Sequence, residues 1–118
     1  MGKQIKITLP FIPPTINKYI GRSNIWQYQA DKKKVHQAIK LLTVGKRYNI
    51  SKCEMTVVYY FKDKRRHDPS NYDKMVLDGL VEANIIEDDN YNIITEFTTR
   101  GDYDKNNPKT KIDIEILE

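Results

Sequence analysis

The sequence has 118 residues and a formal net charge of +4, with 20 lysines and arginines against 16 aspartates and glutamates. This length suits one domain rather than two. The charge excess is compatible with nucleic acid or another anionic surface but does not single one out. Cys53 is the only cysteine, which excludes an internal disulfide and a cysteine-based zinc site.

The N-terminal segment "MGKQIKITLPF" contains no long apolar stretch of the kind found in secretion signals. Nothing in the chain approaches the roughly 18 consecutive apolar residues that a membrane span needs. We therefore expect a cytoplasmic protein without a membrane partner.

The first elements follow from the hydrophobic pattern. Residues 4–9, "QIKITL", alternate apolar and polar positions and predict a strand. Residues 10–30 contain three prolines and a glycine, which favours an irregular, partly extended loop. Asp31 is then the predicted N-cap of a helix, because Val35, Ile39 and Leu42 follow at helical spacing.

The second half supplies three further strands and a helix. Residues 52–63 are rich in β-branched and aromatic residues, and their nearly continuous apolar character favours an interior strand. Residues 70–84 have one apolar helical face with Asn84 as a C-terminal stop, and residues 92–100 and 110–117 read as strands around a turn-rich connector. The predicted fold class is α/β (α+β): a small mixed sheet with two helices, in the order β-α-β-α-β-β.

The segment between the second strand and the second helix has an unusual charge pattern. Lys64, Arg65, Arg66 and His67 run directly into Asp68, which is followed by a proline. Asp-Pro is a common helix start, with the aspartate capping free amides. That interpretation leaves the cations unexplained, whereas cations that hold phosphates beside a carboxylate that holds a divalent metal suit a phosphodiester substrate.

A metal site needs further oxygen ligands, and the next acidic cluster is "EDDN" at residues 87–90. Mg²⁺ keeps several waters, so one or two aspartates can suffice. An EF-hand is excluded, because a loop that starts at Asp88 has Ile93 at the required glycine and Thr99 at the bidentate glutamate. A plain polar turn stays open as the alternative.

Three motifs, "PPTIN" at residues 13–17, "RRHDPSNYDKMVLDGL" at residues 65–80 and "EDDN" at residues 87–90, resemble in register those of the RusA-type endodeoxyribonucleases. "PPTIN" at residues 13–17 resembles the Pro-Pro-Ser/Thr-x-Asn element of that family, and "RRHDPSNYDKMVLDGL" resembles its Asp-x-Asp-Asn-x-x-Lys block. "EDDN" falls where the family has its Asp-Asp pair, and "TRGDYDKNNPKTKIDI" looks like its closing strand pair. The resemblance covers nearly the whole chain, so we expect residues 1–118 to form a single RusA-like nuclease domain.

The resemblance implies a homodimeric, Mg²⁺-dependent resolvase of four-way (Holliday) junctions in branched double-stranded DNA, often encoded by prophages. Mn²⁺ is a substitute metal, and no protein partner is implied beyond the second subunit. By position, the resemblance gives Asp68, Asp89 and Lys74 as catalytic and Asp68, Asp88 and Asp89 as metal ligands. The residues expected to contact DNA are Lys64, Arg65, Arg66, Asn71, Asn17 and Tyr19.

One departure and one geometric problem accompany this resemblance. Ser70 stands where the family has a second aspartate, and a hydroxyl is a weaker Mg²⁺ ligand than a carboxylate. Asp73 is a candidate substitute. In addition, a helix over residues 70–84 would be roughly 20 Å long and would separate Asp68 from Asp89. They can share a metal if the helix is shorter, if the following segment doubles back, or if the partner subunit supplies one of them.

Three functions are therefore carried forward. The first is a junction-resolving endonuclease that makes paired symmetric nicks in DNA recombination and repair. The second is a catalytically weakened protein that binds DNA junctions without cleaving them. The third is a generic small α/β protein with a solvated basic loop, which the loop chemistry and the resemblance disfavour.

Overall fold

The computed structural model describes residues 3–15, 25–44 and 48–117. Four strands form one sheet in the spatial order β1-β4-β2-β3. They are β1 (Gln4–Leu9), β2 (Cys53–Phe61), β3 (Ile94–Tyr103) and β4 (Lys109–Ile116). β4 pairs antiparallel with both β1 and β2, whereas β2 and β3 are parallel. The predicted mixed sheet and the element order are confirmed, as is the interior position of β2.

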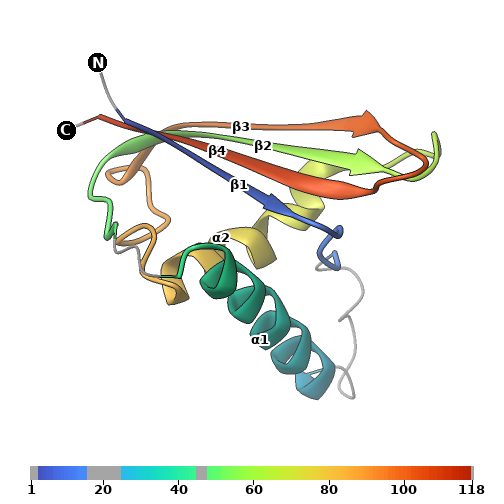
Figure 1. Ribbon diagram of the computed structural model, residues 1–118, viewed down its shortest axis with the longest axis horizontal. Helices are drawn as coiled ribbons and strands as arrows, with labels where there is room; N and C mark the ends of the chain where they lie inside the picture. Colours follow the sequence, from blue (N-terminus) through green and yellow to red (C-terminus); the bar gives the residue numbers. More distant parts are fainter. Residues whose placement is uncertain (1–2, 16–24, 45–47, 118) are drawn as a thin grey trace.

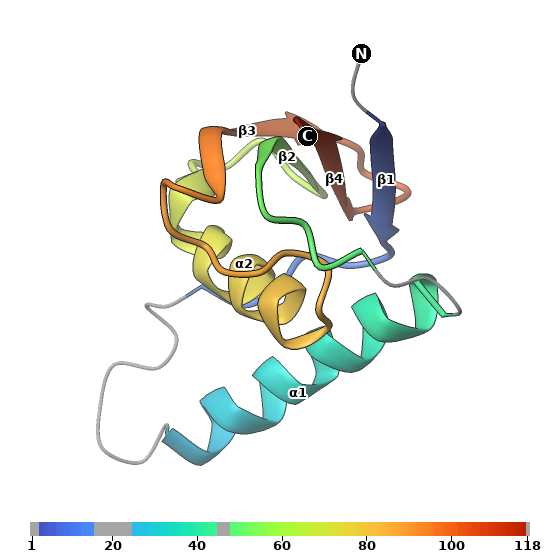
Figure 2. The same cartoon turned by 90° about the vertical axis from the view of Figure 1, so that its left-hand side faces the viewer.

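Two helices cover one face of this sheet and leave the other face open (Figures 1 and 2). α1 (Ile25–Leu42) precedes β2, and α2 (Asp73–Glu82) belongs to the connection from β2 to β3, behind a short 3-10 helix η3 (Pro69–Tyr72). The helices are close enough that a Cβ on Gly79 would lie 2.8 Å from the Ile39 side chain. Lys32 of α1 also forms an ion pair of 2.9 Å with Glu82 of α2.

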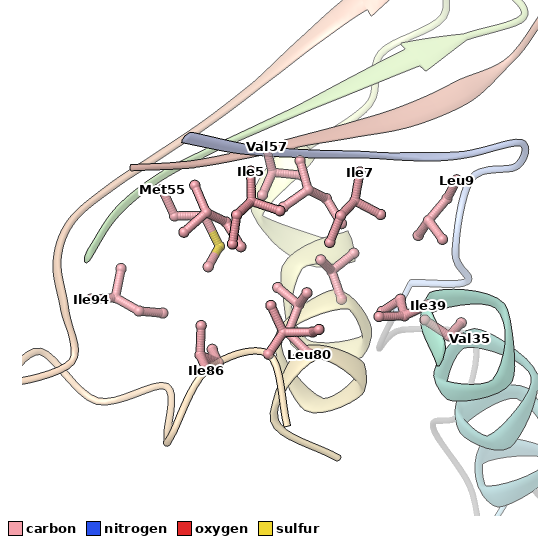
Figure 3. Close-up of a cluster of buried hydrophobic side chains, with 14 of the residues drawn as sticks. Ile5, Ile7, Leu9, Val35, Ile39, Met55, Val57, Leu80, Ile86 and Ile94 are labelled. Carbon is pink, nitrogen blue, oxygen red and sulfur yellow. The ribbon is translucent and has the colours of Figure 1, made fainter. Parts of the chain in front are cut away.

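The core lies between the sheet and the helices, as Figure 3 shows. The alternating side chains of β1 supply Ile5, Ile7 and Leu9, all buried. They face Ile39 and Leu80, which come from the two helices and are fully buried. Burial of such aliphatic side chains supplies most of the free energy that holds a two-layer fold together.

The predicted start of the first helix is wrong. α1 begins at Ile25, and Asp31 is a buried residue inside it rather than its N-cap. Two contacts stabilise the helix at residues 25–30, where the sequence predicted a loop. Asp31 Oδ1 accepts a hydrogen bond of 3.0 Å from Gln27 Nε2 one turn earlier. The Tyr28 hydroxyl donates to Asp78 Oδ2 at 3.0 Å, which ties the first turns of α1 to α2.

The boundaries of the second half are close to those predicted. Asn84 ends the second helix with φ of 60°, and the next amide, that of Ile85, donates back to the carbonyl of Leu80 at 3.0 Å. β3 continues three residues past its predicted end, because it stays paired with β2 up to Phe61 and Tyr103. Within the described ranges, neither helix has the length and apolar character to cross a membrane.

Candidate functional site

The loop that leaves β2 is fixed at its base. The His67 ring stacks on Phe61 with 4.0 Å between ring centroids and 9° between planes. His67 Nε2 lies 2.8 Å from Asp63 Oδ1, which also accepts the backbone N–H of Arg65 at 3.0 Å. The hydrogen bond to His67, followed by the one from Arg65, lowers the pKa of the Asp63 carboxyl. These contacts hold both ends of the cationic segment on the end of the sheet.

The three cations of this loop point to solvent, as expected for phosphate-binding groups. Lys64, Arg65 and Arg66 are all exposed, and the Arg66 side chain is 91% accessible. The Lys64 ammonium lies 5.1 Å from the ring centroid of Tyr103, at the end of β3. Exposed cations on a fixed loop can contact a phosphate backbone with little ordering of the chain on binding.

Asp68 lies at the start of η3 with Pro69 after it, but its side chain makes no capping hydrogen bond. The capping interpretation of the sequence is therefore wrong for the carboxylate. Only the backbone carbonyl of Asp68 closes the turn, accepting the N–H of Asn71 at 2.9 Å. The side chain is 57% exposed, and one carboxylate oxygen lies 3.8 Å from Nε of Arg66. Asp68 thus presents a carboxylate to solvent beside the cations.

The neighbouring candidates divide between surface and core. Ser70 is exposed. Asp73 is buried, and its Oδ1 accepts hydrogen bonds from the hydroxyls of Tyr59 at 2.7 Å and Thr99 at 2.9 Å. Burial raises the pKa of the Asp73 carboxyl, against these two hydrogen bonds. Because Asp73 faces the sheet and anchors α2 to it, it does not replace the missing carboxylate at Ser70.

Lys74 lies on the first turn of α2. Its side chain is 59% exposed, and its Nζ lies 3.5 Å from Asp78 Oδ2, one turn along the same helix. An ion pair of this exposure contributes little stability, so the ammonium can turn toward an incoming phosphate at small cost. Asn17 and Tyr19, the two candidates beside the Pro-Pro element, lie outside the described residues.

The acidic segment at residues 87–90 lies at the opposite end of the sheet from Asp68. Ile86 forms a bridge with Ile50, and the N–H of Glu87 donates to the Ile50 carbonyl at 2.8 Å, just before β2 begins. Figure 1 shows this orange segment at the left, whereas the loop that follows β2 is at the right. Asp88 and Asp89 are exposed there, and Asp88 Oδ1 accepts the N–H of Asp89 at 2.7 Å.

The predicted metal ligands are therefore not brought together within one chain. β2 has nine residues and spans roughly 30 Å; Asp68 follows its end and Asp89 precedes the start of the parallel β3. α2 is shorter than predicted, but the segment after it does not double back. Among the described residues, no three histidine, cysteine, aspartate or glutamate side chains lie close enough to hold a metal ion. One chain by itself does not fit the expected Mg²⁺.

Two of the hollows on the surface formed by the described residues differ in charge. A cleft of about 390 Å³ adjoins the Asp68 loop and is mostly apolar. Another, of about 350 Å³, lies on the open face of the sheet and contains four carboxylates, so it disfavours phosphate. The sequence analysis did not predict the first cleft. Asp63 and His67, which are four residues apart in the sequence, both line it. Its lining residues are Pro10, Phe11, Ile12, Phe61, Lys62, Asp63, His67, Tyr72 and Pro108.

Comparison with known families assigns this arrangement to a class. The family of endodeoxyribonuclease RusA matches residues 5–115, nearly the whole chain. The chain therefore belongs to the RusA endodeoxyribonuclease family, whose members cleave Holliday junctions, and it is an enzyme of phosphodiester hydrolysis. No curated protein matches the sequence.

Proposed function

We propose that this protein is a Mg²⁺-dependent, structure-selective endodeoxyribonuclease that resolves four-way DNA junctions by paired symmetric nicks. Mn²⁺ would serve in place of Mg²⁺. Two symmetric nicks require two active sites related by a two-fold axis, so the working unit is a homodimer. The enzyme would act in the cytoplasm on recombination and repair intermediates of bacterial or prophage DNA.

The observation that carries this proposal is the state of Asp68. Its carboxylate is exposed, makes no capping hydrogen bond, and stands beside exposed cations on a loop fixed at its base. A carboxylate with a purely structural role at a helix start would bond the free amides there. An acid placed instead beside phosphate-binding cations is suited to a scissile phosphate.

The proposed roles follow from position. Lys64, Arg65 and Arg66 hold the DNA backbone, and Lys74 offsets charge that develops on the reacting phosphate. Asn71, with Asn17 and Tyr19, contacts DNA near the branch point. The metal is assigned to Asp68 with Asp88 and Asp89, a set that one chain does not assemble.

The second candidate function is junction binding with weakened catalysis. Ser70 favours it, because this exposed hydroxyl stands at a position where the family has a carboxylate. A protein of this kind would keep the cationic loop and bind branched DNA, but would hydrolyse it slowly or not at all.

A synthetic four-way junction labelled on each strand distinguishes the two functions. The endonuclease gives paired nicks across the junction with Mg²⁺ or Mn²⁺. Asp68→Asn should lower the nicking rate by roughly a hundredfold or more and leave junction binding intact. Asp113→Asn, which changes an exposed aspartate on the open face of the sheet, is the matched control and should cleave normally. Binding without cleavage at any metal concentration would establish the second function.

A further inference from the structure

The apolar cleft beside the Asp68 loop has no part in the metal and phosphate contacts assigned above. Three segments distant in the sequence form it: the chain that leaves β1, the end of β2 with its loop, and the residue before β4. They lie together at the right-hand end of the sheet in Figure 1. The cleft volume of about 390 Å³ is in the lower part of the range of roughly 300–1,000 Å³ for pockets that bind small organic molecules. It therefore suits one flat ring system.

The walls of the cleft are aromatic and held in place. Phe61 is buried, and its ring centroid lies 5.3 Å from that of Tyr72. On the side of β1, the Phe11 carbonyl accepts the Thr110 hydroxyl at 2.9 Å, which fixes this segment on β4. Phe11, His67 and Tyr72 stay partly exposed, so their rings can contact a ligand. Because the walls are already fixed, a flat ring can bind here with little ordering of the protein.

A carboxylate on the lining favours a nucleobase over a phosphate as the occupant. The Asp63 side chain is 33% exposed and lines the cleft. Its hydrogen bonds within the described residues, with His67 Nε2 and with the N–H of Arg65, both end on Oδ1. Oδ2 is therefore left as an acceptor. This carboxylate repels a phosphate, whereas the amino groups on the edges of nucleobases can donate to it.

The rim of the cleft continues into the cationic loop. Lys62 lines the cleft and is exposed, and the exposed Lys64 and Arg65 follow it closely in the chain. These cations can contact the phosphates on either side of a base that lies in the cleft. His67 also lines the cleft and directly precedes Asp68. Aromatic side chains beside cations are the usual combination for binding single-stranded nucleic acid.

We propose that this cleft binds one unpaired nucleobase of the cleaved strand, displaced from its partner at the branch point of the junction. The base packs against Phe11 and Tyr72, and its edge faces Asp63. The inference rests on the proposed function, which supplies the strand and the scissile phosphate next to Asp68. Displacing a base costs least where pairing and stacking are already interrupted. The cleft therefore favours a branch point over continuous duplex DNA.

A set of four-way junctions tests the base contact, each with an abasic nucleotide at one position near the branch point. Binding is measured by fluorescence anisotropy without added divalent metal, so that no strand is cut. At one position the abasic nucleotide should weaken wild-type binding roughly tenfold, because the stacking of that base on an aromatic side chain is lost. Equal affinity for every junction in the set would overturn the proposal.

Variants of Phe11 link that position to the cleft. Phe11→Ala should weaken binding of the intact junction by the same factor and add nothing to the abasic loss, because both changes remove one contact. Phe11→Leu keeps apolar volume without a ring, so it should do the same with less risk to folding, which circular dichroism checks. Tyr48→Ala, which removes a half-buried ring at the opposite end of the sheet, should bind like the wild type. Losses that multiply would overturn the assignment to this cleft.

A mismatch tests whether the base leaves its partner. Mispairing the base found by the abasic series lowers the cost of displacing it, so wild-type affinity should rise severalfold. The gain should be much smaller in Phe11→Leu, in which the displaced base loses its aromatic contact. An unchanged wild-type affinity would show that the base stays paired in the complex, and would overturn the proposal.

These measurements separate the failure of the cleft from the failure of the proposed function. A wild type that nicks the intact junction with Mg²⁺ but binds every abasic junction equally keeps the nuclease and overturns the cleft. A wild type that neither binds nor nicks the junction overturns the proposed function, and the cleft proposal with it.

Discussion

The two ends of the sheet carry opposite chemistry. The end after β2 has the exposed cations Lys64, Arg65 and Arg66 around Asp68. The end before β3 has the exposed acids Glu87, Asp88 and Asp89. Because β2 and β3 are parallel, the connection between them crosses the length of the sheet and fixes this separation. The DNA-binding half and the acidic half of the expected site are therefore complementary parts that one subunit holds apart.

Removing the cations of the first end should have the largest effect. The variant K64A/R65A/R66A should weaken junction binding on the order of a hundredfold at about 0.1 M salt. The slope of log affinity against log salt should fall by roughly three, since each phosphate contact releases about one counterion. Binding is measured by fluorescence anisotropy over a salt series.

The matched control removes as many charges from α1. In K33A/K34A/K40A, three exposed lysines are lost from a helix that takes no part in the proposed site. Its salt slope should stay close to that of the wild type. Equal slopes for the two triple variants would show that net charge, rather than the loop after β2, binds the DNA.

A smaller effect is expected from removing a hydrogen bond that anchors α2, the helix that follows the Asp68 loop, to the sheet. Tyr59→Phe removes one of the two hydroxyls that donate to buried Asp73, which should lower the free energy of unfolding by about 1–3 kcal/mol. Urea denaturation measures this change. Tyr60→Phe is the control, because that half-buried ring lies on the open face, near the ammonium groups of Lys109 and Lys111. Equal losses in both variants would contradict the anchoring role of Asp73.

The smallest effect concerns the acidic half of the open face. Glu54 lies opposite Glu96 on β3 and Glu115 on β4. Its pKa is raised, first by a hydrogen bond with Glu96, then by burial and by the charges of both glutamates. A carboxyl with a raised folded-state pKa binds its proton more tightly in the folded protein. The resulting cost to stability is therefore present at neutral pH and disappears as the pH falls below its unfolded value of about 4.3.

Glu54→Gln should accordingly raise the melting temperature at about pH 7.5 and leave it unchanged near pH 4. Thermal denaturation followed by circular dichroism provides the measurement. A gain of the same size at both pH values would show that the change acts through packing rather than charge.

Local sequence patterns were sufficient for the strands but not for the site. The alternation of Ile5, Ile7 and Leu9 placed β1 correctly, because the pattern of period two is local. Asp31 misled the prediction of α1, since its hydrogen bond to Gln27 and the contact of Tyr28 with Asp78 depend on tertiary packing. Aspartate favours helix starts, but partners from the same helix and from packing can hold it inside one.

The candidate site shows the same limit more clearly. Asp68 was found from its neighbours in the chain, and the structure confirms that its surroundings are cationic and exposed. Its distance from Asp89 depends on whether β3 runs parallel to β2, a long-range choice that no local pattern encodes. The burial of Asp73, which removes it from the candidate metal ligands, also depends on a residue distant in the sequence, Thr99 of β3.

The parallel pairing of β2 and β3 also has a consequence for how the chain folds. Strands joined by a hairpin can pair early, whereas parallel neighbours must wait until the whole connection between them has closed, at a cost in chain entropy. Here that connection begins with the Asp68 loop and ends with the acidic turn. Both segments therefore acquire their final positions in one late, cooperative step, so neither half of the expected nuclease site is formed before β2 and β3 have paired.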